Sequence, residues 1–356
     1  GYRLLESRLK ALGHTLTIVT PHDLGSAASR GRWTPLLYPI VVARWVRAHR
    51  GEFDAFVFHS YAGWIAARPR GRRSFAAVVA FHGLEPLYHR ELLEEAKRSG
   101  RHLTRRYRAL QERAMPFFLR RACQHADLVT CLNAAERRFL VEHGWSAPER
   151  TALVAHGIPD EFFAPERPVR PVRTLLFVGQ WLPMKGVSYL TSAADALLRH
   201  HPGLRLTCAG TLKTAEHVLA GFAPEVRERI RVLPRVERDA LPALYRDADV
   251  FLSPSLYEGF GLAIVEAMAA GLPIVASEVG VAADALQDGE SCLFVLRHDA
   301  PALVQAVERL MADAPLAGRL GRAARAIAER YRTSGRSAEL AGLLVDLAGR
   351  AARTRG

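Results

Sequence analysis

The chain has 356 residues, of which 49% are hydrophobic and 24% are charged, and its formal net charge is +13. This length exceeds one ordinary core and fits two α/β domains, and the composition is that of a globular protein. No run approaches the roughly 18 apolar residues of a membrane-spanning helix, and no signal peptide opens the chain, so we expect neither kind of segment.

The positive charge is concentrated in the first half of the chain. Residues 1–160 carry 25 Lys and Arg against 14 Asp and Glu, whereas residues 161–356 carry 24 against 22. The excess is typical of a surface that attracts an anionic membrane or a phosphate-bearing acceptor. The alternative is an Arg- and Ala-rich composition without such a role, as a GC-rich genome would produce. Nucleic acid is not expected as a partner, because no nucleic-acid motif accompanies the charge.

The cysteines do not indicate a metal site. Four of them stand apart in the sequence without metal-ligand spacing: Cys123, Cys131, Cys208 and Cys292. We expect reduced thiols and a cytoplasmic location.

The first half begins with an amphipathic helix at residues 1–12 and a strand at residues 15–20. Further apolar runs predict buried strands at residues 53–59, 74–81, 126–131 and 151–155. His82 directly follows the strand at 74–81, and the carboxyl ends of parallel strands are where an open α/β sheet binds ligands. His59 ends the strand before it. A lone loop histidine is more often structural.

Residues 91–121 predict a basic helix that also carries aromatic and aliphatic side chains. Such a helix can lie on a membrane surface, although a charge run of this kind is more often a solvated helix face. Asn133 is expected to start the next helix. Residues 161–173 are rich in Pro and Arg without periodicity and predict an interdomain linker, so we expect domains at 1–165 and 166–356.

The second half opens with a predicted strand at 174–178, a loop at 179–186 and a helix at 187–199. Lys185 lies at the beginning of this helix, where a lysine can neutralise a diphosphate. Later segments predict strands at 204–209 and 229–233, a helix at 241–247, helices within 301–330 that break near Pro315, and a last helix at 338–348.

Residues 250–277 predict a strand, a glycine loop, a helix and another strand. The helix begins after Gly259-Phe260-Gly261, so its free N–H groups and positive dipole end point at the loop and offer a seat for phosphate. Glu258 and Glu266 flank this seat. Carboxylates do not bind phosphate, and their expected partners are hydroxyl groups. Phosphate and hydroxyl groups in one cleft indicate a nucleotide sugar.

The stretch 257–273, Tyr-Glu-Gly-Phe-Gly-Leu-x-x-x-Glu-Ala-Met-Ala-x-Gly-x-Pro, resembles the retaining glycosyltransferases of family 4. The match continues through Gly280, Asp284 and residues 288–290 and extends backward through most of the chain. The resemblance implies the GT-B fold: two Rossmann-like domains facing a cleft, with the last helix crossing back to the first domain. It also implies an acceptor-binding first domain and a nucleotide-sugar-binding second domain.

The resemblance implies a role for each site residue. Glu258 contacts the donor sugar, and His82 contacts it from the other domain; these two are the candidate catalytic residues. Lys185 holds the diphosphate, and Glu266 accepts hydrogen bonds from the ribose. The remaining candidate donor-binding residues are Gly259, Phe260, Gly261, Leu262, Gln180 and Val236. Transfer with retention, without a metal or other cofactor, is implied, in polysaccharide or cell-envelope synthesis on a glycan, lipid-linked or small-molecule acceptor.

The chain departs from the family pattern at three places. Gln180 stands where members often carry Arg, which removes a charge from the phosphate site. His156 stands where they usually have Asn. A strand and glycine-rich turn that precede the first helix in the family are missing, which suggests that the sequence is trimmed at its start.

Several alternatives remain open at this point. A GT-B epimerase or phosphorylase, or a nucleotide-sugar binder that has lost catalysis, would share the fold. A NAD-dependent oxidoreductase would use Glu278 on the ribose, but Ile264 occupies the position of its third fingerprint glycine. Residues 247–249, Asp-Ala-Asp, look like a metal-binding motif and are better explained as the end of a helix.

Overall fold

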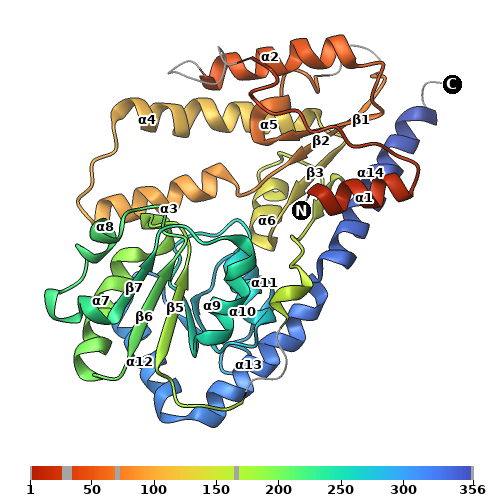
Figure 1. The fold of residues 1–356 in the computed structure, drawn as a ribbon. Helices are drawn as coiled ribbons and strands as arrows, with labels where there is room; N and C mark the ends of the chain where they lie inside the picture. Colours follow the sequence, from red (N-terminus) through yellow and green to blue (C-terminus); the bar gives the residue numbers. More distant parts are fainter. Residues whose placement is uncertain (1, 26–33, 69–72, 164–167, 354–356) are drawn as a thin grey trace. The chain divides into compact units, whose positions relative to one another are not determined.

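The structure, a computed structural model, describes residues 2–25, 34–68, 73–163 and 168–353. It divides into two compact units (Figure 1). Unit 1 comprises Gly1–His89, Arg101–Gly157 and Thr333–Gly356, and unit 2 comprises Arg90–Gly100 and Ile158–Arg332. The main passage from unit 1 to unit 2 lies between residues 157 and 158, whereas the predicted domains meet at 165 and 166. Residues 164–167 of the predicted linker lie outside the described residues.

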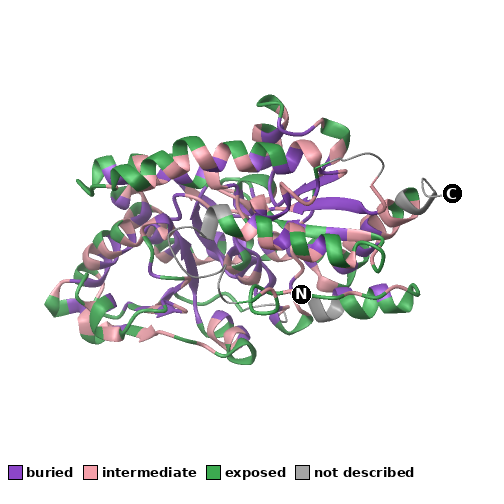
Figure 2. Ribbon diagram, turned by 90° about the horizontal axis from the view of Figure 1, so that it is seen from above, coloured by how far each residue is buried: buried purple, intermediate pink, exposed green. Residues whose placement is uncertain are grey.

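Unit 1 is built on a four-stranded parallel sheet with the order β1-β2-β3-β4. The strands are β1 (Ala55–His59), β2 (Ala76–Ala80), β3 (Leu128–Cys131) and β4 (Thr151–Leu153). Each strand pairs in parallel with its neighbour, as Val78 does with Leu128. The buried strands appear purple in Figure 2. The central strands β2 and β3 are buried on both faces and mostly apolar, as parallel strands covered by helices must be.

Helices of unit 1 cover this sheet. They are α1 (Tyr2–Ala11), α2 (Thr34–His49), the start of α3 (Glu85–Arg98), α4 (Arg105–Ala109), α5 (Met115–His125), α6 (Ala134–Glu142) and α14 (Thr333–Arg353). The helix α14 packs against α1, and both contribute to one apolar cluster with β2 and β3. As predicted, Asn133 precedes a helix: its side chain accepts a hydrogen bond from the Glu136 N–H at 2.8 Å and caps α6.

Unit 2 is built on a six-stranded parallel sheet with the order β10-β9-β8-β5-β6-β7. The strands are β5 (Thr174–Val178), β6 (Arg205–Ala209), β7 (Ile230–Leu233), β8 (Val250–Ser253), β9 (Ile274–Ser277) and β10 (Leu293–Val295). Chain order runs outward from β5 in one direction to β7 and from β8 in the other direction to β10. The order reverses between β5 and β8, and this reversal is the switch point at which doubly wound sheets bind ligands.

The helices of unit 2 alternate with these strands or follow the last of them. They are α7 (Val187–His200), α8 (Ala215–Leu219), α9 (Leu241–Asp247), α10 (Leu262–Ala269), α11 (Val281–Ala285), α12 (Ala300–Ala312) and α13 (Ala314–Ala328). A large apolar core joins α7 and α12 to the sheet through side chains such as Leu190, Leu197 and Leu303. None of the helices in the described ranges combines the length and the apolar character that crossing a membrane requires.

Three predicted elements differ from the structure. The strand at residues 15–20 is wrong, because no other described segment pairs with these residues and a strand needs a hydrogen-bonded neighbour. The helix at 91–121 is broken after Arg98, because Gly100 adopts a φ of +68° and Thr104 caps the separate helix α4. The last helix was predicted too short at both ends: it begins at Thr333, and helix-favouring residues continue it to Arg353.

Candidate functional site

Two loops meet at the switch point of the unit 2 sheet. One follows β5 and leads through Lys185 into α7, and the other follows β8 and leads through Glu258 into α10. Both loops leave the carboxyl ends of neighbouring strands, since β5 pairs with β8. Because both connect a strand to a helix at the same edge, they bring two helix N-termini to one place.

Gly186 holds the two loops together. Its φ is +67°, and a Cβ atom added to it would lie 1.9 Å from the carbonyl oxygen of Pro254. Only glycine allows this close approach and this backbone conformation. The Leu256 N–H donates to the Met184 carbonyl oxygen at 2.8 Å and adds a direct bond between the loops.

A second glycine fixes the Glu258 loop from its other side. Gly280 has a φ of +57°, and its Cβ would lie 2.7 Å from the Cβ of Glu258 and 2.6 Å from the carbonyl oxygen of Phe260. The Val281 N–H donates to that same oxygen at 2.7 Å. Gly261, with a φ of +98°, is the N-cap residue of α10. The loop that carries Glu258 is therefore packed on both sides.

Lys185 and Glu258 contact each other directly. The Lys185 Nζ lies 2.7 and 2.8 Å from the two carboxylate oxygens of Glu258. Ser255 Oγ donates to one of these oxygens at 2.7 Å. The two side chains are 28% and 10% exposed, so the ion pair is largely shielded from water. A cation and a carboxylate, 73 residues apart in sequence, thus meet between the two helix N-termini.

Glu266 lies in the second turn of α10 and is held by a buried tyrosine. The Tyr245 hydroxyl donates to Glu266 Oε2 at 2.7 Å, and Tyr245 is fully buried. Burial raises the pKa of Glu266 to about 6, although the Tyr245 hydrogen bond and the charge of Arg238 act in the opposite direction. A carboxylate with this pKa accepts hydrogen bonds at neutral pH and loses its charge in mild acid.

The other predicted donor-site residues are distributed along the same loops. Gln180 is exposed two residues after β5, and Val236 is half-buried after β7. Leu262 is 46% exposed in the first turn of α10, and Phe260 is buried against the Tyr331 ring, with the ring centroids 5.9 Å apart. Gly259 is half-buried in the glycine loop.

His82 lies in unit 1 between two other imidazoles. Its ring is 4.7 Å from that of His59 and 6.0 Å from that of His156, centroid to centroid, and the planes are nearly parallel. His59 ends β1, and His82 and His156 follow β2 and β4, so all three lie at the carboxyl edge of the sheet. Burial, followed by the nearby His82, lowers the pKa of His59 and lowers that of His156 to about 4. Both imidazoles are therefore neutral at pH 7.

Two polar residues of the site were not predicted from the sequence. Tyr245 was read only as part of a helix and Ser255 only as part of the motif, yet these side chains hold Glu266 and Glu258. Ser255 lies three residues from Glu258, a spacing that offered a local signal. Tyr245 lies 21 residues from Glu266, and no local pattern connects them.

The Asp-Ala-Asp sequence at 247–249 has a structural role. Asp249 accepts hydrogen bonds from the N–H groups of Arg173 and Thr174 and pairs with Arg170 at 2.5 Å. Its carboxylate therefore stabilises the start of β5. Within the described ranges, no three His, Cys, Asp or Glu side chains gather as a metal site would require.

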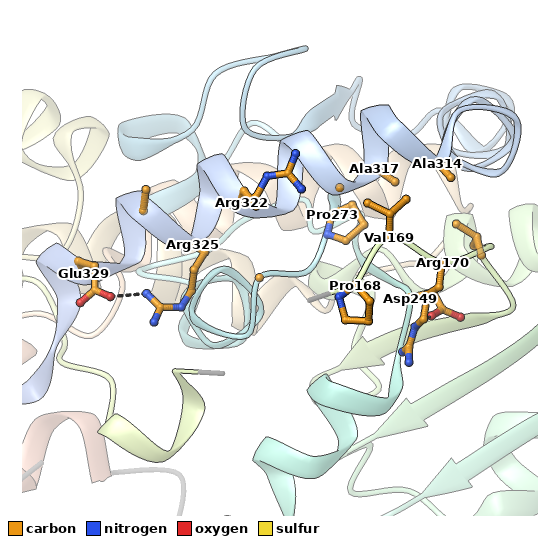
Figure 3. Close-up of a pocket in the computed structure, with 14 residues that line it drawn as sticks. Pro168, Val169, Arg170, Asp249, Pro273, Ala314, Ala317, Arg322, Arg325 and Glu329 are labelled. Atoms are coloured by element: carbon orange, nitrogen blue, oxygen red, sulfur yellow. Dashed lines mark hydrogen bonds and ion pairs between the residues drawn. The ribbon is translucent and has the colours of Figure 1, made fainter. Parts of the chain in front are cut away.

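A cavity of about 390 Å³ lies elsewhere in unit 2 (Figure 3). Asp249 and Pro273, which precede β8 and β9, line it, so it faces the amino edge of the sheet. Arg170 pairs with Asp249 there, and Arg325 pairs with Glu329. This edge is opposite to the one that carries Lys185 and Glu258, and the cavity is separate from the predicted site.

Two family models together match nearly the whole chain. The model described as Glycosyltransferase Family 4 matches residues 3–162, and the model described as Glycosyl transferases group 1 matches residues 160–327. The chain belongs to the family 4 glycosyltransferases. Membership of this family confirms the resemblance found in the sequence and rejects the alternative of a NAD-dependent oxidoreductase.

Curated relatives of this glycosyltransferase-family chain include two bacterial enzymes. The D-inositol 3-phosphate glycosyltransferases of Acidothermus cellulolyticus and Corynebacterium aurimucosum are 34% and 30% identical to it. The alignments cover 63% and 64% of this chain but only 55% and 60% of the relatives. The chain thus matches little more than half the length of these relatives.

Solved structures with the same fold cover almost all of the chain. The sucrose-phosphate synthase of Thermosynechococcus elongatus aligns with a TM-score of 0.77 at 21% identity, covering 98% of this chain and 93% of its own. Anabaena HepE in complex with UDP-glucose aligns with a TM-score of 0.66 at 18% identity, covering 86% and 82%. At these identities the likeness concerns the fold alone, and it confirms the predicted GT-B fold.

Proposed function

We propose that this family 4 protein transfers a sugar from a nucleotide-diphosphate sugar to an acceptor. The observation that carries the proposal is the meeting of Lys185 and Glu258 between two helix N-termini at the switch point of unit 2. A cation and backbone N–H groups suit a diphosphate, and a carboxylate suits sugar hydroxyl groups. A protein related in fold, Anabaena HepE, has been crystallised with UDP-glucose, which supports a donor of this class.

Each side chain then has one role toward the donor. Lys185 and the N–H groups of Phe260 and Gly261 hold the diphosphate, whose negative charge grows as the glycosidic bond to phosphate breaks. One such fixed donor typically lowers the barrier by ~3 kcal/mol. Glu266 accepts hydrogen bonds from the ribose, and Glu258 accepts them from the sugar, near the positive charge on the anomeric carbon. Val236 and Gln180 complete the donor site beside the base and the phosphates.

Unit 1 supplies the acceptor side in this proposal. His82, the exposed middle ring of the three-imidazole stack, contacts the transferred sugar. Transfer proceeds with retention of configuration and without a metal ion, as the family resemblance implies. The acceptor is a glycan, a lipid-linked sugar or a small polyol. Support for the last class comes from the curated relatives, which are named for D-inositol 3-phosphate.

The proposal includes contact with an anionic membrane, on its cytoplasmic face. A basic aromatic patch in unit 1, formed by Trp64, Phe117, Phe118 and Arg121, supports it. Phe117 is 49% exposed, its ring packs against Trp64, and the Arg121 guanidinium lies 5.6 Å from its centroid. Exposed aromatic and cationic side chains together suit an anionic headgroup layer.

Liposome sedimentation tests the membrane contact. The protein should pellet with anionic vesicles at low salt and much less at high salt, because screening weakens the attraction. Phe117→Ser should reduce pelleting, whereas the matched change of exposed Leu182 to Ser, in unit 2, should not. Absence of pelleting at low salt removes this part of the proposal.

Donor binding and turnover test the main proposal. A panel of nucleotide sugars is screened for thermal stabilisation, and the stabilising donor is then incubated with candidate acceptors while released nucleoside diphosphate is measured. We expect that one donor binds and that it releases nucleoside diphosphate when an acceptor is present. Donor conversion without acceptor consumption would instead indicate an epimerase, and binding without turnover would indicate a binder weakened at Gln180.

A further inference from the structure

The ion pair between Lys185 and Glu258 has a consequence for the order of events at the donor site. Both carboxylate oxygens of Glu258 lie within 2.8 Å of Lys185 Nζ, so the carboxylate accepts two hydrogen bonds from the ammonium group. The Lys185 stem lies along Gly179, with its Cδ and Cε atoms 3.7 Å from a Cβ built there. The cation proposed to bind phosphate is thus already neutralised by the carboxylate proposed to bind sugar.

The surrounding contacts keep Glu258 at this position. Ser255 Oγ donates to Glu258 Oε1 at 2.7 Å, and Gly280 packs against the Glu258 Cβ. The side chain of Glu258 is 10% exposed, so it has little room to turn into solvent. Its carboxylate therefore lies against Lys185, and Ser255 and Gly280 hold it there.

A diphosphate and this carboxylate compete for the same cation. A phosphate group that approaches Lys185 weakens the ion pair and meets the like charge of Glu258 at close range, which disfavours binding. A nucleotide sugar compensates, because its sugar hydroxyl groups donate hydrogen bonds to Glu258 in place of Lys185. A nucleoside diphosphate, which lacks the sugar, brings no such compensation.

We propose that Glu258 and the diphosphate compete for Lys185: the ion pair opens for the diphosphate only when the hydroxyl groups of a sugar replace the lysine as the partner of Glu258, and it forms again after transfer. The carboxylate thereby favours the intact donor over the nucleoside diphosphate and helps to expel that product. This inference rests on the proposed function. It adds to that function a discrimination between substrate and product, built from the same two side chains.

Calorimetric titration of Glu258→Gln tests the proposal, with UDP and UDP-glucose as first probes and other nucleoside diphosphates and their sugars if these do not bind. Gln keeps the size and can still contact hydroxyl groups, but it cannot neutralise Lys185. We expect the nucleoside diphosphate to bind about tenfold more tightly, since the removal of one close like charge is worth roughly this factor. The nucleotide sugar should gain less, and product inhibition should increase.

Two further variants complete the design. Glu258→Asp keeps the charge but is one methylene too short to chelate Lys185, and it should show part of the same gain for UDP. Glu228→Gln, an exposed position just before β7 at the opposite sheet edge, matches the change in net charge and should leave both affinities unaltered. Circular dichroism and thermal melting verify that each variant folds.

The possible results distinguish a failure of the proposed function from a failure of this inference alone. A wild-type protein that binds no nucleotide or nucleotide sugar refutes the proposed function and this inference together. A wild-type protein that binds both, with UDP affinity in Glu258→Gln and Glu258→Asp unchanged or weaker, refutes the inference alone. The inference is supported if these two variants bind the nucleoside diphosphate more tightly than the wild type does, with a smaller gain for the nucleotide sugar, and if Glu228→Gln shows no such gain.

Discussion

Replacement of Tyr245 by Phe should change the pH at which the donor binds. The substitution keeps the buried ring and removes only the hydroxyl that donates to Glu266 at 2.7 Å. This hydrogen bond favours the ionised carboxylate, and burial has already raised the pKa of Glu266 to about 6. Its loss should therefore raise that pKa further.

The magnitude follows from the strength of the lost bond. A hydrogen bond to a charged acceptor contributes about 1.5–3 kcal/mol, and about 1.4 kcal/mol corresponds to one pKa unit. The pKa of Glu266 in Tyr245→Phe should then lie between about 7 and about 8. At pH 7 the ionised fraction falls from about nine-tenths to between about one-half and one-tenth. Because the ionised carboxylate is the better acceptor for ribose hydroxyl groups, donor affinity should fall about two- to tenfold.

Donor affinity measured by calorimetry between pH 5.5 and 9 checks this expectation. Wild-type affinity should decline as the pH falls through about 6, and the decline in Tyr245→Phe should begin at higher pH, with recovery toward pH 9. Tyr189→Phe is the matched control, because that hydroxyl donates to Glu95 instead. If donor affinity declines at the same pH in the wild type and in Tyr245→Phe, the role of the Tyr245 hydrogen bond to Glu266 is refuted.

Three other predictions address the phosphate seat, the loop packing and the chemistry. Lys185→Ala should slow turnover about 100-fold, while the affinity for the nucleoside without phosphates stays the same. Lys213→Ala, at an exposed position, is the control. Unchanged turnover in Lys185→Ala would show that Lys185 does not bind the diphosphate. Gly186→Ala should lower the unfolding free energy by about 3 kcal/mol in urea titrations, because the new Cβ atom would clash with Pro254. Gly203→Ala is the control, since a Cβ atom there meets no other atom within 4 Å. Equal urea midpoints for the two variants would contradict the packing of Gly186 against Pro254. EDTA should leave turnover unchanged, and a loss restored by divalent cations would contradict metal independence.

Much of unit 2 could be predicted from the sequence because its signals are local. Buried strands such as β5 and β8 are short apolar runs, and the motif that carries Glu258 and Glu266 is one contiguous stretch. The carboxyl ends of such strands share one edge, so Lys185 and Glu258 could be expected at the same place. Their direct ion pair could not, because sequence separation gives no distance between side chains.

Unit 1 was harder to predict because its features depend on pairing and packing. Residues 15–20 have the composition of a strand but no partner within the described sheet. The three-imidazole stack arises from the parallel register of β1, β2 and β4. His82, His59 and His156 were each noted in the sequence, but no local pattern indicated that their rings stack. The π-helical turn at Leu110–Ala114, just before Pro116, likewise has no periodic signal in the sequence.

The most direct test of the central claim is calorimetric titration of the wild-type protein and of Glu266→Ala with the nucleotide sugar that gives the largest thermal stabilisation. We expect one donor to bind per wild-type chain and at least tenfold weaker binding by the variant, because the ribose loses its acceptor. Equal affinity in the two proteins would contradict a donor site at the switch point of unit 2.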